Sequence, residues 1–411
     1  MAYTAVSLFS GCGGFCEGMH LAGFDVLAGV ELDRFACETY RHNFPHVPLF
    51  EGDVSHFLND AAPEWRAERS RFDALADGAD VVFGGPPCQG YSQIGTRKMD
   101  DPRNRLYEQF VRVLVELRPR VFIMENVPNM LMLRGGHFRD QALDAFAEHG
   151  YRHSAVRVLH ASDFGVPQLR KRAIFIGIRD DLDLGADVGE WMDAVAKAER
   201  RPERTVWDAI RDLPEQVSAN DGPLPYPSSR ATSAALDELR LDRDGEFYTA
   251  EEKQARLDGT RLYNHHTKEI QARRKHLISH LRPGMKADSL PKELWDGLRP
   301  EKWRRLDPNA PAYTILAQMH RDLSEWVHPK FERWITVREA ARLQSFHDGF
   351  VFKSSEWQML KQIGNAVPPL LGRAAGVVAL RALQALDGED EGAALQLALG
   401  TPAEELASAA A

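Results

Sequence analysis

The first 180 residues alternate short apolar runs with amphipathic stretches, and this alternation constrains the fold more than any other feature. Such a pattern is typical of βα units, which assemble into a parallel sheet. Ligands of open α/β sheets bind outside the carboxyl ends of the strands. The pattern predicts helices over residues 106–117 and 138–149 and strands over residues 5–9, 26–30, 80–83, 121–124, 155–159 and 173–178.

A glycine-rich loop follows the first predicted strand, with the sequence Phe9-Ser10-Gly11-Cys12-Gly13-Gly14. Glycines in this place let the backbone approach a ligand closely. Glu31 ends the second predicted strand, where an acid is placed to accept hydrogen bonds from ribose hydroxyls. Asp53 is a third feature, suited to an adenine amino group. Together they predict a nucleoside cofactor, although their spacing does not separate S-adenosylmethionine from a dinucleotide.

The segment after the third predicted strand reads Gly84-Gly85-Pro86-Pro87-Cys88-Gln89-Gly90. Its two prolines restrict φ and favour a rigid turn. Most buried cysteines are inert packing, but a cysteine in a rigid turn at the ligand edge is a candidate nucleophile. The next strand ends in Glu125 and Asn126, so a carboxylate follows a neighbouring strand end. A thiol and a carboxylate placed in this way resemble a nucleophile with its acid/base partner.

Three polar residues, Gln168, Arg170 and Arg172, alternate along the segment that leads into the last predicted strand. Alternate residues of an extended segment point to one face, so we expect the three side chains to project together. Guanidinium groups suit a phosphate or a carbonyl oxygen. A solvated basic edge is the alternative reading.

The formal net charge of −9 argues at face value against a nucleic-acid partner. The distribution of charge weakens that argument. Between Arg261 and Arg305 there are twelve Lys or Arg and five Asp or Glu, a local charge of +7 (twelve minus five). Phosphate contacts need such local positive potential. The region therefore indicates either a DNA-contacting face or an ordinary solvated surface.

The four cysteines, Cys12, Cys16, Cys37 and Cys88, are too few for a disulfide scaffold in 411 residues. We expect no metal site, because no His or Cys cluster accompanies the pair Cys12 and Cys16. No Lys or Arg precedes Arg34, so the N-terminus does not read as a signal peptide, and we see no membrane-spanning run. These features predict a cytoplasmic protein.

The chain resembles the DNA (cytosine-5)-methyltransferases of bacterial modification systems, including Dcm-like enzymes. The resemblance covers nearly the whole chain and rests on motifs in family order: FSGCGG, ELD, GDV, GGPPCQGYS, DPRNRLY, ENVPN, GVPQLRKR, HP, TVREAARLQSF and IGNAVPP. It implies an α/β fold, with a large Rossmann-like S-adenosylmethionine-dependent methyltransferase domain and a smaller target-recognition domain. One departure is His347, which stands where the family commonly has proline.

The resemblance also implies roles for the residues in these motifs. Cys88 would add to carbon 6 of a flipped cytosine, Glu125 would bind its N3 and amino group, and Arg172 would hold its O2. Arg170 would support the Cys88 loop, while Gln168 and Asn126 would order the pocket. The cofactor S-adenosylmethionine would contact Phe9, Ser10, Gly11, Gly13, Gly14, Glu31, Asp53, Pro87, Leu106, Asn365, Ala366 and Val367.

For the partner, double-stranded DNA, the resemblance implies a mobile loop over residues 89–104, with Ser92, Gln93 and Arg97 near the duplex. Further candidate DNA contacts are Arg261, Arg273, Arg274, Lys275, Arg304 and Arg305. We expect a catalytic domain over 1–184, a target-recognition domain over 185–334 and a segment over 335–386 that returns to the catalytic domain. The acidic residues 387–411 read as a disordered tail. We expect a monomer, with a cognate restriction endonuclease as a further possible partner.

Three other readings compete with this one. A tRNA cytosine-5 methyltransferase shares the motifs, although the long segment before TVREAARLQSF favours duplex DNA. A catalytically dead DNA-binding protein would be expected to lack Cys88, Glu125 or the arginines, and all are present. A dinucleotide oxidoreductase would explain the glycines and Glu31 but would leave the PPCQ, ENV and QLRKR segments without a purpose.

Overall fold

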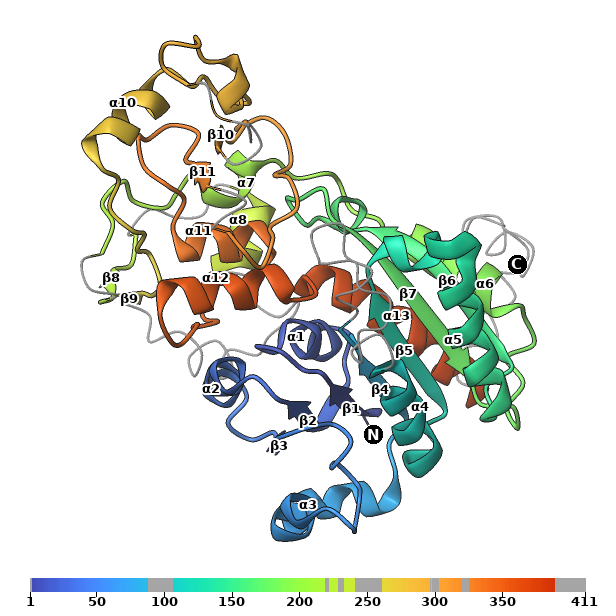
Figure 1. Cartoon of the computed structure of the whole chain (residues 1–411). Coiled ribbons are helices and arrows are strands. Elements are labelled where there is room, and N and C mark those ends of the chain that lie inside the picture. The colour runs from blue at the N-terminus through green and yellow to red at the C-terminus, as the bar shows by residue number, and fades with distance from the viewer. Residues whose placement is uncertain are drawn as a thin grey trace, which may run out of the picture.

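The computed structural model describes residues 2–87, 106–218, 222–227, 233–240, 261–295, 297, 303–319 and 325–388. A large lobe is built around one central sheet, and a small lobe stands at one end of it (Figure 1). This two-lobed α/β architecture confirms the fold class expected from the sequence.

The sheet has seven strands in the order β3-β2-β1-β4-β5-β7-β6. The strands are β1 (Thr4–Leu8), β2 (Asp25–Glu31), β3 (Leu49–Glu51), β4 (Val81–Gly84), β5 (Val121–Asn126), β6 (His153–His160) and β7 (Lys171–Ile178). Strands β1 to β5 pair in parallel, whereas β7 is antiparallel to both β5 and β6. The expectation of a parallel sheet is therefore wrong at β7. The three-residue β3 is absent from the predicted strands because its apolar run is too short to stand out.

Helices cover both faces of the sheet, and each face has its own apolar core. On β1 the side chain of Ala5 joins one core, and those of Val6 and Leu8 join the other, as the alternation of a strand requires. One face carries α1 (Gly14–Leu21), α2 (Arg34–Asn43), α6 (Val188–Ala198) and α13 (Pro369–Leu386); the other carries α3 (Pro63–Glu68), α4 (Leu106–Leu117) and α5 (His137–Glu148). Short 3-10 helices are η1 (Arg69–Asp77), η3 (Pro128–Leu131), η4 (Leu133–Gly136), η5 (Ala161–Phe164) and η6 (Ala287–Ser289).

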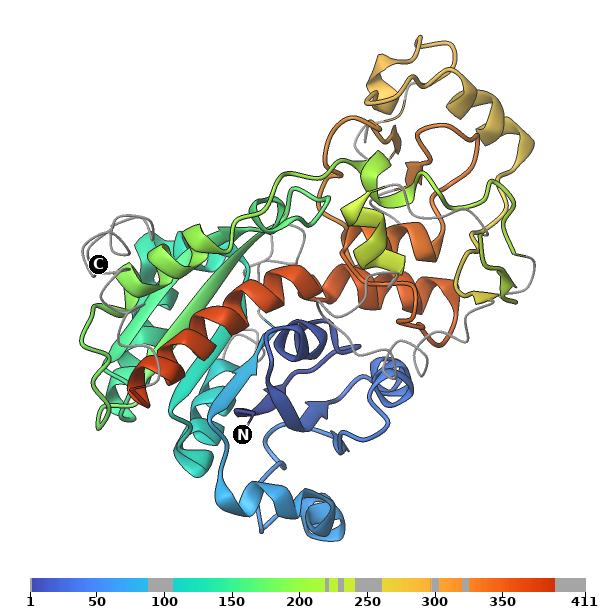
Figure 2. The ribbon, with the colours of Figure 1, turned by 180° about the vertical axis from the view of Figure 1, so that it is seen from behind.

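The C-terminal part of the chain returns to the large lobe through α12 (Glu356–Asn365) and α13, which crosses the sheet in Figure 2. A Cβ added to Gly18 of α1 would lie 2.6 Å from the backbone of Gly372 of α13, so these helices cross in close backbone contact. By length and composition alone, Glu356–Leu386 could span a membrane, contrary to the sequence expectation. Because 83% of its apolar window is buried inside the protein, we assign it to the core.

The small lobe is built from short elements. They include α7 (Val206–Ile210), α8 (Ala234–Arg240), α10 (Ala272–Ser279), β8 (Leu224–Pro225), β9 (Arg261–Leu262), β10 (Trp303–Arg305) and β11 (Glu325–Val327). The lobe has a small core of its own, formed by Ile278, Leu281, Leu290, Val327 and Trp334, whereas the apolar side chains of α7, α8 and β9 join the core of the large lobe. Helix α6 packs on β6 and α13 of the large lobe. The predicted boundary after residue 184 thus precedes a helix that packs on the large lobe.

The start of the acidic C-terminal segment belongs to the fold. Asp387 accepts hydrogen bonds from the Tyr3 hydroxyl at 2.7 Å and from Arg120 Nη2 at 2.5 Å. The expectation of a disordered tail is therefore wrong for Asp387. Residues 389–411 lie outside the described residues.

Helix α11 (Val337–Leu343) joins the two lobes through buried charges. Thr336 and Glu339 form a capping box at its N-terminus. Arg342 is fully buried and pairs with Asp348 at 2.6 Å and with Asp212, which follows α7, at 2.5 Å. A buried cation is tolerated only with such partners, so this network fixes α7 against α11.

Stability at acidic pH is expected to depend on His328, which is 1% exposed. Its Nδ1 accepts the amides of Lys330 and Phe331, both at 3.0 Å, so the ring is neutral with its proton on Nε2. Burial lowers the pKa of His328 to about 4. The unfolded chain takes up this proton near pH 6.5 and the folded chain only near pH 4. We therefore expect unfolding free energy to fall by about 3 kcal/mol as pH drops through that window.

Urea unfolding at pH 7, 5.5 and 4.5 measures this loss. His328→Asn is the matched variant, since an amide oxygen still accepts the two backbone amides but does not titrate. The pH slope should be smaller in the variant. Equal slopes in both proteins would show that another group carries the proton uptake.

Candidate active site

The loop between β1 and α1 contains three residues in the left-handed backbone region. Their φ angles are 54° at Phe9, 57° at Gly11 and 103° at Gly13. For a residue with a side chain this conformation costs about 1–2 kcal/mol and is concentrated at functional sites. The Ser10 hydroxyl accepts the Val30 amide of β2 at 3.0 Å. The loop is therefore shaped and anchored at the carboxyl edge of the sheet.

Glu31 closes this loop from the end of β2. Its Oε2 accepts the Gly11 amide at 2.7 Å, and its Oε1 accepts the amides of Leu32 at 2.9 Å and Asp33 at 2.7 Å. Burial raises the pKa of Glu31, and these hydrogen bonds act against that rise. Leu32 is 68% exposed, so an apolar side chain stands beside the carboxylate. Leu32 is missing from the site residues predicted from the sequence. The signal that could have identified it is its place as an apolar residue directly after an acid at a strand end.

Asp53 lies on the neighbouring strand end, as its position after β3 requires. The Gly52 amide donates to the Glu31 carbonyl at 2.9 Å, which ties the two segments together. Asp53 is exposed, and its Oδ1 accepts the amide and hydroxyl of Ser55 at 2.8 and 2.7 Å. Burial alone would raise the pKa of Asp53, but these bonds outweigh it and lower the pKa. The structure thus brings the loop and both predicted acids to one edge.

The segment after α12 reaches the same loop from the C-terminal part of the chain. A Cβ added to Gly14 would lie 2.5 Å from the Val367 carbonyl oxygen and 3.1 Å from the Ala366 Cβ. Gly14 is therefore needed for this close approach. The side chains of Ala366 and Val367 are buried, whereas Asn365 is exposed beside them. Of these three predicted residues, Asn365 is therefore the one whose side chain is open to a ligand, whereas Ala366 and Val367 pack against the loop.

The turn after β4 is described as far as Pro87, which is exposed. The Asn126 side chain donates to the Pro86 carbonyl at 3.2 Å, so the ends of β4 and β5 are joined at the turn. Cys88 lies outside the described residues, and so do Gln89, Ser92, Gln93 and Arg97. Leu106 is half-buried at the start of α4, where the described chain resumes.

Glu125 at the end of β5 forms an ion pair with Arg172, with 2.5 Å between Oε1 and Nε. Both side chains are 13% exposed. The other carboxylate oxygen of Glu125, Oε2, lies so close to Gly85 that a Cβ added to this glycine would be 2.7 Å from it. The carboxylate is thus held between the guanidinium and the turn that leads to Cys88.

The reversed direction of β7 explains this pairing. In a parallel strand the segment before β7 would lie at the opposite edge of the sheet from Glu125. Because β7 is antiparallel, Ala173 pairs with Asn126 and Ile174 pairs with Glu125. Arg172 is then the diagonal neighbour of Glu125 on the same face. The chain reversal therefore brings the arginine to the ligand edge.

Gln168 and Arg170 do not share the contacts of Arg172. Arg170 is 1% exposed and donates to the carbonyls of Ile315, Gly364 and Ala366, each at 3.0 Å. Gln168 is fully buried, and its Oε1 accepts the Ile315 amide at 2.9 Å. Burial lowers the pKa of Arg170 and the nearby charge of Arg172 lowers it further, so these two guanidinium groups lie close together although their partners differ. In the described residues, Arg170 supports the segment around Asn365 and the irregular segment around Ile315.

The basic residues of the small lobe fall into two groups. Arg305 is 4% exposed and donates to the carbonyls of Leu281 at 2.6 Å, Ile278 at 2.8 Å and His328 at 3.0 Å. Burial lowers the pKa of Arg305. Its guanidinium braces the lobe, so the prediction of a DNA contact is not supported.

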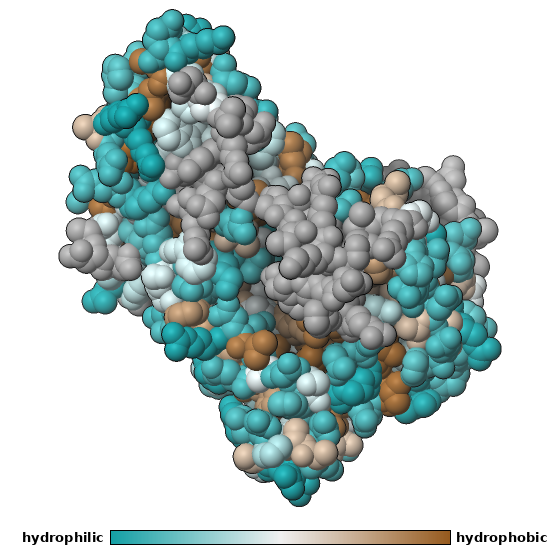
Figure 3. Space-filling view, in the orientation of Figure 1, coloured by the Kyte–Doolittle hydropathy of each residue, from teal (hydrophilic) through white to brown (hydrophobic). Residues whose placement is uncertain are grey.

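Arg304 is 8% exposed, and its guanidinium lies 3.7 Å from the centre of the Tyr313 ring. The prediction that Arg304 contacts DNA is therefore not supported either. The candidates Arg261, Arg273 and Lys275 are exposed, and Arg274 is half-buried with its guanidinium 5.9 Å from the Trp303 ring. The face of the small lobe shown in Figure 3 is mainly hydrophilic, and apolar surface gathers below the junction of the lobes.

His347, the departure from the family pattern, is 5% exposed and forms a buried pair with Glu17 of α1 at 3.2 Å. Glu17 is fully buried. The pair joins the first helix to the turn after α11. The polar residue at this position is therefore matched by a charged partner that proline could not bind.

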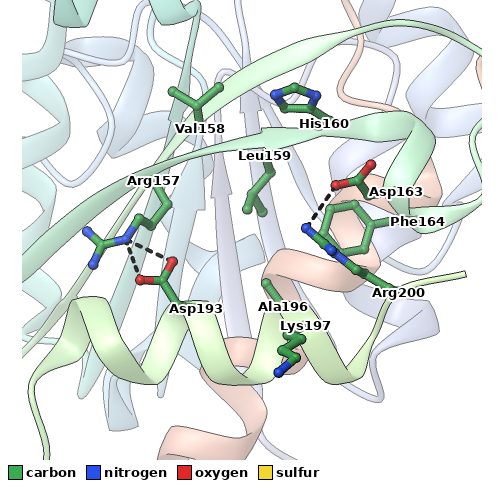
Figure 4. Close-up of a pocket in the computed structure, with 10 residues that line it drawn as sticks. All are labelled: Arg157, Val158, Leu159, His160, Asp163, Phe164, Asp193, Ala196, Lys197 and Arg200. Atoms are coloured by element: carbon green, nitrogen blue, oxygen red, sulfur yellow. Dashed lines mark hydrogen bonds and ion pairs between the residues drawn. The ribbon is translucent and has the colours of Figure 1, made fainter.

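Other candidate sites carry no predicted residue. A cavity of about 140 Å³ between β6 and α6 is lined by two ion pairs, Arg157 with Asp193 and Arg200 with Asp163 (Figure 4). In the described part of the chain, no group of three His, Cys, Asp or Glu side chains is arranged for a metal.

Comparison with solved structures places this architecture. A chain from an E. coli prophage, assigned as a DNA modification methyltransferase, superposes with a TM-score of 0.72 and 28% identity, covering 93% of this chain and 100% of that one. The S. pombe Dnmt2 methyltransferase superposes with a TM-score of 0.50 and 17% identity, covering 93% of this chain and 98% of that one, which shows the fold alone. The fold is that of S-adenosylmethionine-dependent methyltransferases.

Comparison of sequences gives the family. The C-5 cytosine-specific DNA methylase family matches residues 3–378. The type II methyltransferase M.XorII of Xanthomonas oryzae pv. oryzae is 33% identical over 393 residues, which are 92% of this chain and 85% of that protein. M1.HphI of Haemophilus parahaemolyticus is 32% identical over 389 residues, 93% and 87% of the two chains. The chain belongs to the C-5 cytosine-specific DNA methylases and is a DNA (cytosine-5)-methyltransferase of the restriction-modification type.

Proposed function

We propose that this enzyme methylates carbon 5 of a flipped cytosine in a specific duplex sequence, through a covalent bond between Cys88 and carbon 6. The observation that carries the proposal is the ion pair of Glu125 and Arg172 beside the turn Gly85-Pro86-Pro87. Pro87 directly precedes Cys88 in the sequence.

The residues at the edge fit S-adenosylmethionine as the cofactor. Glu31 offers a fixed carboxylate for ribose hydroxyls, and exposed Leu32 offers an apolar face for adenine. The N-terminus of α1 favours a carboxylate, and Gly14 there lies against Ala366 and Val367, which directly follow the exposed Asn365. We assign these residues, with Asp53, to the cofactor. When bound, S-adenosylmethionine supplies an electrophilic methyl group.

The side chains at the base-binding edge account for the activation of cytosine. Carbon 5 is a poor nucleophile until a nucleophile adds at carbon 6. The Cys88 thiolate forms the bond to carbon 6, and Glu125 stabilises the ring by hydrogen bonding N3 and the amino group. Arg172 holds both Glu125 and the O2 atom of the base. After carbon 5 is methylated it loses its proton, and the bond from sulfur to carbon 6 breaks to release the thiolate.

The target atom cannot be reached inside a duplex, so the base must leave the stack at a cost of a few kcal/mol. We assign this step to residues 89–104, which lie outside the described residues. We also propose that the enzyme is a monomer and that it acts in the cytoplasm, where bacterial DNA lies. A restriction endonuclease is proposed as its partner in the modification system.

Helix α10 is the proposed phosphate contact of the small lobe. The double variant Arg273→Ala with Lys275→Ala removes two exposed cations and should weaken DNA binding in low salt by about tenfold. The slope of log affinity against log salt should fall by about 2, because about two fewer counterions are released. Fluorescence anisotropy over a salt series measures both values.

The matched control for α10 is Lys197→Ala with Arg200→Ala, two exposed cations, one on α6 and one just after its end. Its salt slope should equal that of the wild type. If both double variants lose the same slope, α10 has no special part in DNA binding.

Transfer of a labelled methyl group tests the substrate. The enzyme is incubated with labelled S-adenosylmethionine and mixed-sequence duplex DNA, and bisulfite sequencing then locates protected cytosines. Protection in one short sequence context is expected. Label that enters tRNA and not DNA would contradict the proposed substrate, and label in neither would favour a catalytically dead protein.

A further inference from the structure

Helix α2 lies beside the chain that enters α12 and is joined to it by side-chain hydrogen bonds. The Asn43 side chain exchanges two hydrogen bonds with the backbone of Val351, both at 2.9 Å. The Gln362 amide donates to the Phe35 carbonyl at 3.0 Å. We call these contacts the seam. They join α2 to the C-terminal segment from Phe35 to Asn43, over most of the length of α2.

An ion pair stands at the end of the seam nearest the active site. Lys361 Nζ lies 2.6 Å from Asp33 Oδ2, and each side chain is 32% exposed. Asp33 also caps α2, since its Oδ1 accepts the Phe35 amide at 3.0 Å. Burial alone would raise the pKa of Asp33, but Lys361 outweighs it and lowers the pKa. The carboxylate is therefore charged at neutral pH and pairs with the ammonium group.

Each residue of the ion pair is close to one side of the proposed cofactor site: Asp33 to Glu31, and Lys361 to Asn365. The amide of Asp33 donates to Glu31 Oε1 at 2.7 Å. Lys361 lies four residues before Asn365 on α12, about one helical turn away. From the opposite side, Arg170 and the Gln344 side chain donate to the Ala366 carbonyl at 3.0 and 2.9 Å. The end of α12 is thus held between two sets of contacts.

We propose that the Lys361–Asp33 ion pair is a clasp that holds the end of α12 against the Glu31 loop and so sets the spacing of the S-adenosylmethionine pocket. Asp33 and Lys361 are positioning residues: they act through Glu31 and Asn365. This inference rests on the proposed function, because it assigns the pocket to that cofactor.

The clasp links segments that are 328 residues apart in the sequence. Without it, the Glu31 loop keeps its own backbone hydrogen bonds and α12 keeps Arg170. The pocket would therefore survive but be less well organised before binding, and the cofactor would have to order it. For a partly exposed ion pair we expect an effect of about fivefold on the dissociation constant.

The test uses Lys361→Met, Asp33→Asn and the double variant in the full chain. Asparagine caps a helix as well as aspartate does, so Asp33→Asn removes the charge and keeps the cap. Calorimetric titration with S-adenosylmethionine should show about fivefold weaker binding for each single variant. The double variant should be no weaker than either single one, because one interaction is removed in all three.

Arg71→Met is the control, since it breaks an ion pair of the same 2.6 Å length, with Glu68, where α3 meets η1 on the other face of the sheet. Its affinity should match the wild type. A KM for cofactor that rises while the KM for DNA stays constant also supports the clasp. Unchanged affinity in the Lys361 and Asp33 variants, additive losses in the double variant, or a lower melting temperature as the sole effect would each overturn it. Failure of the wild type itself to bind S-adenosylmethionine would instead refute the proposed function.

Discussion

Replacing Cys88 with serine is expected to abolish methyl transfer while the protein still binds DNA and cofactor. A serine hydroxyl is not ionised at neutral pH, so it cannot add to carbon 6 as a thiolate does. Loss of a nucleophile from a working site lowers turnover by at least about 10⁴-fold. Single-turnover transfer of labelled methyl, with DNA binding followed separately, measures the two properties.

The other cysteines provide the control for this variant. Burial raises the pKa of Cys12 to about 12, of Cys16 to about 11 and of Cys37 to about 12, so these thiols are protonated at neutral pH. Cys16→Ser should therefore retain turnover. Activity of Cys88→Ser within tenfold of the wild type would rule out the covalent mechanism.

The second large effect is expected for Glu125→Gln, which keeps the size of the side chain and removes its charge. The variant leaves Arg172 without its carboxylate at 2.5 Å and weakens the support of the ring while the thiolate adds. We expect the rate of the chemical step to fall by about 10²–10³-fold, the range for one acid/base or electrostatic group. Rapid-quench single-turnover kinetics measures this rate.

Glu51→Gln is the matched control, because Glu51 also ends a strand of the sheet and pairs with an arginine, Arg41, at 2.6 Å. Its rate should be close to that of the wild type. A Glu125→Gln rate within about threefold of the wild type would remove Glu125 from the chemical step.

The sequence predicts those parts of the fold whose cause is local. Helix α4 occupies the predicted residues 106–117, and six of the seven strands of the sheet overlap predicted ones, because apolar periodicity follows from burial. Strand direction is not local. Nothing in the residues of β7 differs between a parallel and an antiparallel strand, although its reversal is what brings Arg172 to Glu125.

The predicted site shows the same division. Glu31 and Glu125 lie at strand ends and Asp53 follows one, so their position at one edge of the sheet could be predicted from the chain order. Arg304 and Arg305 belong to a basic sequence but are buried, because tertiary packing provides an aromatic ring for one and carbonyl partners for the other. The partner of Lys361 could not be predicted, since Asp33 is 328 residues away.

The most direct test of the central claim is the mass of a trapped complex. Duplex DNA with 5-fluorocytosine at the methylated position lacks the proton that carbon 5 must lose, so a covalent complex that has accepted the methyl group cannot release the thiolate. The account predicts a complex with the mass of protein, DNA and one methyl group, formed only with S-adenosylmethionine and attached through Cys88 in the digested peptide. Methylation of ordinary cytosine without any such complex, or attachment at another residue, would contradict it.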